Sequence, residues 1–170
     1  RMVIDDEGGP HRIVDVRTGD EPVRLEGDLR GVAVSPDGTR LAGGVEGGVR
    51  VLDISTGRDV HRLDAEGAVR FVAFSPDGDR LAAINAEGTL FLWETGTLDR
   101  VATIAGNGRW FPVLAFSPDG TRLAVPAADY AVRIHDAATG AETAVMRGHA
   151  ADVRNLRFVA DGASVVSISN

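Results

Sequence analysis

The tetrapeptide Ser-Pro-Asp-Gly occurs three times in this chain, and the regular distance between its copies constrains the fold more than any other feature. The copies occupy residues 35–38, 75–78 and 117–120, and a diverged copy, Val-Ala-Asp-Gly, occupies residues 159–162. The repeated aspartates are therefore 40, 42 and 42 residues apart. A period of this length predicts a repeat architecture in which each unit packs on copies of itself.

Each unit has the pattern of four short strands. Alternating apolar residues precede the turn, as at Val72 and Phe74, and such alternation indicates a strand. Proline, aspartate and glycine then favour a tight turn for separate conformational reasons. A second strand follows, and a third and a fourth strand flank a Thr-Gly turn. We assign a turn-forming, structural role to Asp37, Asp77, Asp119 and Asp161, and we align the Thr-Gly turns at Gly19, Gly57, Gly96 and Gly140.

The repeat resembles the WD40 family of β-propellers, and the clearest motif is Gly148-His149 followed by an alternating strand and Asp-Gly. Where the family has Trp-Asp, this chain has Leu52-Asp53, Trp93-Glu94 and His135-Asp136. The resemblance implies that His149 and Ser167 supply half of the family's buried hydrogen-bond network in the last unit. TolB-like propellers share the Ser-Pro-Asp-Gly turn and are the second candidate family.

These features predict an all-β fold, an arc of a WD40-like propeller built from four-stranded antiparallel meander blades and incomplete at both ends. We expect residues 1–170 to form a single propeller segment. The expected units are a partial blade at 1–28, blades at 29–67, 68–108 and 109–150, and a partial blade at 151–170. In the simpler interpretation, further blades of a longer parent chain cover the open ends of the arc. The alternative is a head-to-tail dimer of arcs.

Composition narrows the classes of function. The chain has no cysteine and no lysine, which excludes thiol catalysis, cysteine-ligated zinc and a Schiff-base lysine. The net charge of −7 disfavours partnership with nucleic acid or an anionic membrane. No motif for catalysis, metal or a cofactor is present, and the "GGVEGG" segment at residues 43–48 is interpreted as a tight turn. We therefore expect no enzymatic activity, metal or cofactor.

Two features are candidates for partner binding. The first is the connection containing Arg109 and Trp110, because arginine and tryptophan are enriched in interface hot spots. The alternative is that Trp110 fills a gap between blades. The second is the row formed by Arg30, Arg70 and Arg154, which share one register near the start of the first strand. Their guanidiniums suit carboxylate or phosphate. The alternative is that each arginine pairs with a neighbouring acid.

The sequence thus favours a non-catalytic protein-interaction scaffold, a segment of a larger bacterial regulatory or signalling protein in the cytoplasm. The expected partner is a protein or an acidic peptide. The competing interpretation is a small-ligand-binding or catalytic propeller that uses the central channel. A third is a segment that only completes a ring whose binding face lies on other blades.

Overall fold

The structure, a computed structural model, describes residues 2–4, 12–14, 18, 23–25, 27–106, 113–159 and 161–170. Its strands are β1 (Met2–Ile4), β2 (Arg12–Val14), β3 (Val23–Arg24), β4 (Arg30–Val34), β5 (Arg40–Asp53), β6 (Asp59–Phe74), β7 (Arg80–Asn85), β8 (Leu90–Glu94), β9 (Arg100–Ile104), β10 (Ala115–Phe116), β11 (Arg122–Pro126), β12 (Val132–Asp136), β13 (Glu142–Met146), β14 (Val153–Phe158) and β15 (Val165–Ser169). Within these described residues no helix is long and apolar enough to span a membrane.

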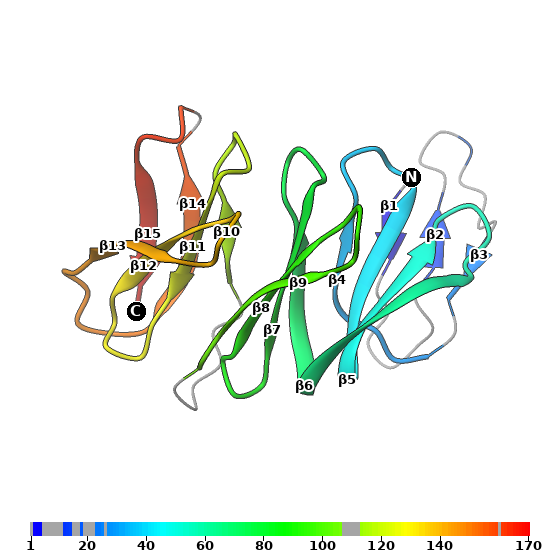
Figure 1. Cartoon of the computed structure of the whole chain (residues 1–170), viewed down its shortest axis with the longest axis horizontal. Helices are drawn as coiled ribbons and strands as arrows, with labels where there is room; N and C mark the ends of the chain where they lie inside the picture. Colours follow the sequence, from blue (N-terminus) through cyan, green and yellow to red (C-terminus); the bar gives the residue numbers. More distant parts are fainter. Residues whose placement is uncertain are drawn as a thin grey trace.

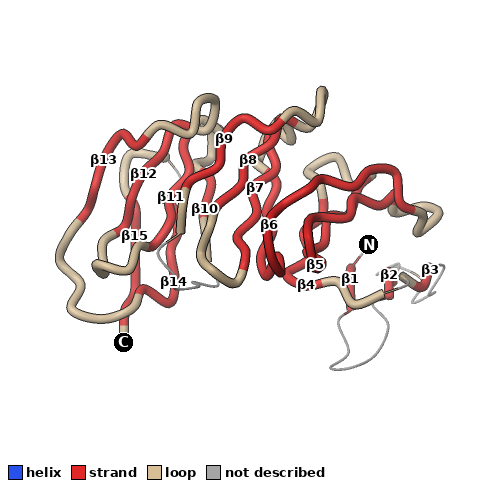
Figure 2. The backbone as a smooth tube through the Cα atoms, turned by 60° about the horizontal axis from the view of Figure 1, so that its bottom comes forward, coloured by secondary structure: helices blue, strands red, loops and turns tan. Residues whose placement is uncertain are grey.

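The strands form antiparallel sheets that stand side by side in an arc (Figure 1). The sheet β1-β2-β3 lies at the N-terminal end and the pair β14-β15 at the C-terminal end. Between them lie the sheet β4 to β9 and the sheet β10 to β13. Figure 2 shows the same row from a second direction, with the connecting turns along its margins. The predicted all-β propeller arc is confirmed.

The sheet β4 to β9 contains two blades that share one strand. Residues 59–64 of β6 pair with β5, as at Leu63 and Val49, whereas residues 69–74 pair with β7, as at Val72 and Ala83. β6 is therefore the outer strand of one blade and the inner strand of the next. We name blade 1 (β4, β5 and residues 59–64), blade 2 (residues 69–74, β7, β8 and β9) and blade 3 (β10 to β13).

β5 supplies the second and third strands of blade 1 through one bend. The amide of Ile54 donates to the carbonyl of Thr39 over 3.0 Å, so the two ends of β5 lie side by side. Gly47 has a φ of 76°, a conformation that glycine adopts without steric cost. Equivalent bonds join Thr95 to Asp79 in blade 2 and Ala137 to Thr121 in blade 3. The three blades therefore share one meander.

The core lies between the blades, because successive residues of a strand face opposite neighbours. In β11, Leu123 packs with residues of blade 2, whereas Ala124 packs with β14. Both are fully buried. Burial of a Val, Leu, Ile or Phe side chain contributes about 1.5–3 kcal/mol. Three apolar layers of this kind join blade 1 to blade 2, blade 2 to blade 3, and blade 3 to the pair β14-β15.

The Ser-Pro-Asp-Gly turns have one hydrogen-bond pattern in all three blades. In the first, the amide of Gly38 donates to the carbonyl of Ser35, and the Ser35 hydroxyl donates to Asp37 Oδ1 over 2.6 Å. The same carboxylate oxygen accepts from the amide of Thr39. The serines are buried and fully satisfied, with the first at 8% exposure and the others at 0%. Each aspartate thus closes its turn, as its residue type favours.

One predicted alignment of the Thr-Gly turns is wrong. Gly57 and Gly140 have positive φ, and their amides donate to the carbonyls of Asp53 and Asp136. In blade 2 the residue that does so is Leu98, with a φ of 66°, whose amide donates to the carbonyl of Glu94. Gly96 lies two residues earlier. The hydrogen-bonded ring, rather than the local Thr-Gly pair, determines the register.

Candidate partner-binding edge

The three arginines of the shared register lie at irregularities in the inner strands. The pairing register shifts between Val69 and Phe71, which isolates Arg70, and between Val153 and Asn155, which isolates Arg154. A shift in β4 begins at Arg30. A β-bulge of this kind turns a side chain away from the regular ladder. The residues that precede these arginines, Leu29, Val69 and Val153, are at most 2% exposed, so each bulge is anchored on the core.

The bulges lie at the end of the inner strands opposite the aspartate turns. Arg30 begins β4, and Val34, at its other end, leads into the turn at residues 35–38. A strand of five residues spans about 17 Å. We call the edge that carries Arg30, Arg70 and Arg154 the rim edge, and the opposite edge, which carries the aspartate turns, the turn edge. Gly31 lies against the Arg70 carbonyl, so neighbouring bulges touch.

The three arginines have different surroundings. Arg30 is 3.1 Å from a carboxylate oxygen of Asp28, so its charge is compensated locally, as one alternative from the sequence anticipates. Arg70 is exposed and makes no ion pair with any residue that the structure describes. Arg154 is exposed and faces the side-chain amide of Asn170. The net positive charge at this register therefore comes from Arg70 and Arg154.

Arg109 and Trp110 lie outside the described residues, so their part in binding stays a prediction. Their connection leaves blade 2 through Gly106, at the rim edge. A Cβ added to Gly106 would lie 2.4 Å from the carbonyl oxygen of Glu87 and 2.5 Å from the amide of Thr89. This close approach to the turn between β7 and β8 requires glycine.

His149 and Ser167 are brought together by the last sheet. His149 follows β13, Ser167 lies in β15, and its Oγ is 2.6 Å from His149 Nε2. Both side chains are half-buried. The same strand, β15, exposes Val166 and Ile168, at 55% and 57%. Association of two arcs through such edges stays a prediction.

The aspartates of the turn edge serve the fold. The Ser117 hydroxyl donates to Asp119, which also accepts from the amide and hydroxyl of Thr121, and these bonds lower the pKa of Asp119 to about 2. The same serine bond is the largest cause of the lowered pKa of Asp37 and Asp77. Asp161 accepts from the amide of Ala163, but a valine stands where the other turns have serine. Carboxylates held in this way are structural acceptors.

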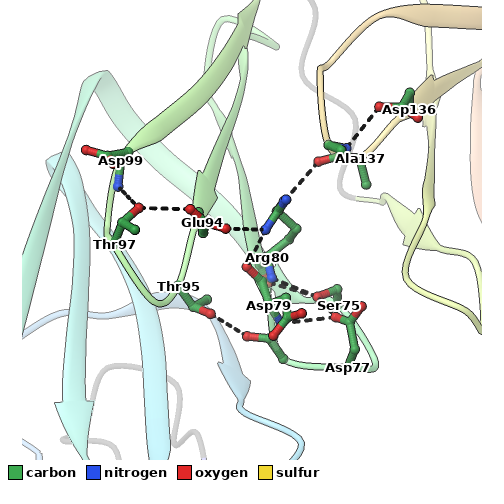
Figure 3. Close-up of polar contacts among 12 residues, drawn as sticks. Ser75, Asp77, Asp79, Arg80, Glu94, Thr95, Thr97, Asp99, Asp136 and Ala137 are labelled. Carbon is green, nitrogen blue, oxygen red and sulfur yellow. Dashed lines mark hydrogen bonds and ion pairs between the residues drawn. The ribbon is translucent and has the colours of Figure 1, made fainter.

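The structure shows arginines that link neighbouring blades and that were not predicted from the sequence. The Arg80 guanidinium donates to the carbonyl of Ala137 in blade 3 over 3.2 Å and pairs with Glu94 over 3.3 Å (Figure 3). Arg122 repeats this contact one blade later, donating to the carbonyl of Gly162 over 2.7 Å. The signal in the sequence was an arginine at the third position after each of the first three repeated aspartates, Arg40, Arg80 and Arg122.

No group of three or more His, Asp or Glu side chains placed to hold a metal ion occurs in the part of the chain that the structure describes. Residues 57–94 match the family model described as "WD domain, G-beta repeat", which confirms the resemblance found in the sequence. No curated protein matches the chain in sequence.

The fold is widespread among solved structures, of which 1187 chains match. One, titled "Kuenenia stuttgartiensis Hydrazine Synthase", superimposes with a TM-score of 0.76 at 21% sequence identity. The match covers 93% of this chain and 49% of that one, so this chain spans about half of its length. A likeness at this identity concerns the fold.

Proposed function

From a WD40-like arc that carries a WD40 repeat at residues 57–94, we propose a non-catalytic interaction module that binds acidic peptides at the rim edge. WD40 repeats generally mediate protein interaction, and WD40 domains commonly bind proteins or peptides. The observation that carries the proposal is the bulge, which recurs in inner strands and directs Arg70 and Arg154 away from the ladder.

Guanidinium chemistry defines the partner. Arginine binds carboxylate and phosphate through two parallel hydrogen bonds, and it keeps its charge at every physiological pH. Arg70 and Arg154 are exposed, and their backbones are fixed by buried neighbours at Val69 and Val153. Little backbone ordering is therefore needed on binding, which favours affinity.

The net charge of the whole chain has the same sign as that of the acidic partner. At a net charge of −7 the long-range field repels an acidic peptide, so attraction is confined to the rim edge. Contacts between exposed charges weaken with salt, since the screening length is about 8 Å at physiological ionic strength. Binding should accordingly be modest and strongly dependent on salt.

The proposal also includes the setting of the chain, as one segment of a larger bacterial regulatory or signalling protein in the cytoplasm. An arginine-only, Ala-, Gly- and Val-rich composition is typical of GC-rich bacterial genomes. The competing proposal is a propeller that binds a small ligand, or catalyses a reaction, in its central channel. It calls for converging histidines and acids on the inner strands. The described inner strands contain no histidine or acid and are made mainly of arginine and apolar residues, which supports the first proposal.

The test is the binding of a fluorescein-labelled acidic peptide, Glu-rich or phosphorylated, measured by fluorescence polarisation at several salt concentrations. Arg70→Gln and Arg154→Gln should each weaken binding about fivefold, and the double variant more, because each removes a charge-assisted hydrogen bond. Arg58→Gln is the matched control, an exposed arginine on the turn edge. Equal loss in the control, or no loss in the double variant, would contradict binding at the rim edge.

A further inference from the structure

A groove lies between blades 1 and 2 beside the outer strand of blade 1, and the residue of one turn accounts for it. Between blades 2 and 3 the corresponding place is closed, because a Cβ added to Gly140 would overlap the Cβ of Ala102. Leu98 is the equivalent turn residue of blade 2, and His61 pairs with the third strand of blade 1 as Ala102 does in blade 2. Leucine and histidine here take the places of glycine and alanine, so the turn and the strand are held apart.

Two adjoining hollows form this groove, which we call the outer groove. Four residues line both hollows, His61, Leu63, Trp93 and Leu98. The first hollow has a volume of about 110 Å³, and the rest of its apolar wall consists of Val51, Phe74 and Leu81. The second, of about 280 Å³, is more open and reaches Arg100. An apolar cavity of about 150 Å³ is large enough for benzene, so the first hollow has the size of a branched aliphatic side chain.

Arg40, a half-buried residue of the turn edge, also lines the first hollow. Its counterparts Arg80 and Arg122 donate to carbonyls of the following blade. The side chain of Arg40 makes no hydrogen bond or ion pair with any residue that the structure describes. Glu94, the carboxylate of the same hollow, pairs instead with Arg80 over 3.3 Å. Arg40 therefore brings N–H donors and a positive charge to an apolar hollow, and a carboxylate is the partner that suits them.

Arg100 brings a second positive charge, in the second hollow. Its guanidinium lies 5.8 Å from the centre of the Trp93 ring and donates to the carbonyl of Asp64. Neither contact neutralises the charge. Arginines outnumber acids among the residues that line the two hollows, with Arg40, Arg62 and Arg100 against Asp64 and Glu94. The outer groove is thus locally positive on a chain whose net charge is −7, and it favours an acidic partner.

We propose that the outer groove is a docking site for an extended acidic peptide that carries leucine, or another branched aliphatic residue, between its acids. The aliphatic side chain enters the first hollow against Trp93 and Leu98, and the flanking carboxylates bind Arg40 and Arg100. Two guanidiniums with an apolar hollow call for two carboxylates with an apolar group, which a peptide supplies and a single carboxylic acid does not. None of Arg30, Arg70 and Arg154 lines the groove, so this site does not rest on binding at the rim edge.

The test is fluorescence polarisation with the fluorescein-labelled peptide Asp-Glu-Leu-Glu-Asp, titrated with the full chain. The chain carries Arg70→Gln and Arg154→Gln together, so that the rim edge does not contribute to the signal. A peptide with glycine in place of the leucine should bind at least about tenfold more weakly, because the first hollow then buries no apolar side chain. Equal affinity for the two peptides would overturn the proposal, whether or not the wild-type chain binds acidic peptides at the rim edge.

Variants in the same background locate the peptide. His61→Trp places an indole over both hollows from an exposed position of β6 and should abolish binding of the leucine peptide. Ala144→Trp is the matched control, since it adds the same side chain at the equivalent place on the outer strand of blade 3. Arg40→Gln should weaken binding about fivefold, and Arg58→Gln should leave it unchanged. Binding that survives both His61→Trp and Arg40→Gln, or equal losses in the controls, would contradict docking in the outer groove.

Discussion

The two interfaces that flank blade 2 use the same strand positions with different chemistry. Toward blade 1, Phe91 and Trp93 stack, and the guanidinium of Arg100 lies 5.2 Å from the centre of the Phe91 ring and 5.8 Å from that of the Trp93 ring. Toward blade 3, a cavity of about 240 Å³ lies between Ile84 and Ile104 of blade 2 and His135 of blade 3, and Arg80 donates to the carbonyl of Ala137. No side-chain bond from Arg40 to blade 2 occurs among the described residues. One interface has stacked aromatic rings, and the other has a polar link.

This difference shows what the repeat requires. The backbone meander and the aspartate turns recur, but the manner in which one blade is held against the next does not. Protein interiors are close-packed, so a change of side-chain volume at one register must be met by a neighbour or remain as a cavity. Beside His135 a cavity remains. Arg80, at the turn edge, links the same two blades through the carbonyl of Ala137.

The largest expected effect is at the interface with the stacked aromatic rings, between blades 1 and 2. Trp93→Ala should lower the free energy of unfolding by about 4 kcal/mol, as large truncations in cores do. His135→Ala should cost less than half of this, because the imidazole is smaller and already borders a cavity. Urea denaturation of both variants provides the measurement. Equal losses would remove the distinction between the two interfaces.

The next effect concerns the polar link. Arg80→Met keeps the aliphatic stem but leaves the Ala137 carbonyl without its donor and Glu94 without its ion-pair partner, and we expect a loss of about 1.5 kcal/mol. The matched variant Arg40→Met should change stability by less than about 0.5 kcal/mol. Thermal unfolding of the two variants checks the contrast. Similar losses would show that the first interface has a polar link as well.

A smaller effect reverses the usual order of stability, in which an alanine variant is more stable than a glycine variant at the same position. At Leu98, with a φ of 66°, alanine retains the cost of the left-handed conformation and glycine does not. Leu98→Gly should therefore be more stable than Leu98→Ala by about 1 kcal/mol, although both lose the packing of the leucine on the core of the first interface. At Thr103, an exposed position in β9, the order should be the opposite. The same order at both positions would contradict a role for Leu98 as the turn residue.

The smallest effect tests the turn edge, which the two interfaces share. The pKa of Asp119 is about 2 in the folded chain against 3.8 ordinarily, so the folded state binds fewer protons between these values. The stability that this carboxylate contributes is present above pH 4 and is lost as pH falls toward 2. Asp119→Asn, or Ser117→Ala, should narrow the difference in Tm between pH 6 and pH 2.5. An unchanged difference would assign the acid sensitivity to other carboxylates.

The architecture could be predicted from the sequence because local and long-range signals agree. The aspartates Asp37, Asp77 and Asp119 mark turns that form through neighbouring residues alone, and the period between them implies stacked sheets. The register of the third Thr-Gly turn could not be predicted. Thr95-Gly96 has the residues of the motif, but the turn is closed by the hydrogen bond from the Leu98 amide to the Glu94 carbonyl. Leucine is rare at positive φ, so residue preference led to the neighbouring glycine.

The candidate sites were predictable to different degrees. The shared register of Arg70 and Arg154 is visible in the sequence, but the bulge that turns them outward depends on pairing with β7 and β15. The substitution of His135 for the family's tryptophan is also visible. The cavity beside it is not, because its size depends on how closely Ile84 and Ile104 approach from another blade.

The shared strand β6 affects how the molecule opens. Between β9 of blade 2 and β10 of blade 3, the described residues on either side, 105–106 and 113–114, belong to no strand. Blades 1 and 2 have no such joint, because Asp59–Phe74 is continuous through both sheets. A fluctuation that detaches blade 1 must break this strand in its middle, so backbone amides on both halves should exchange with solvent in one event. The smallest cooperative unit in this part of the chain is thus a pair of blades, and a duplication that copies one blade alone would have to divide a strand.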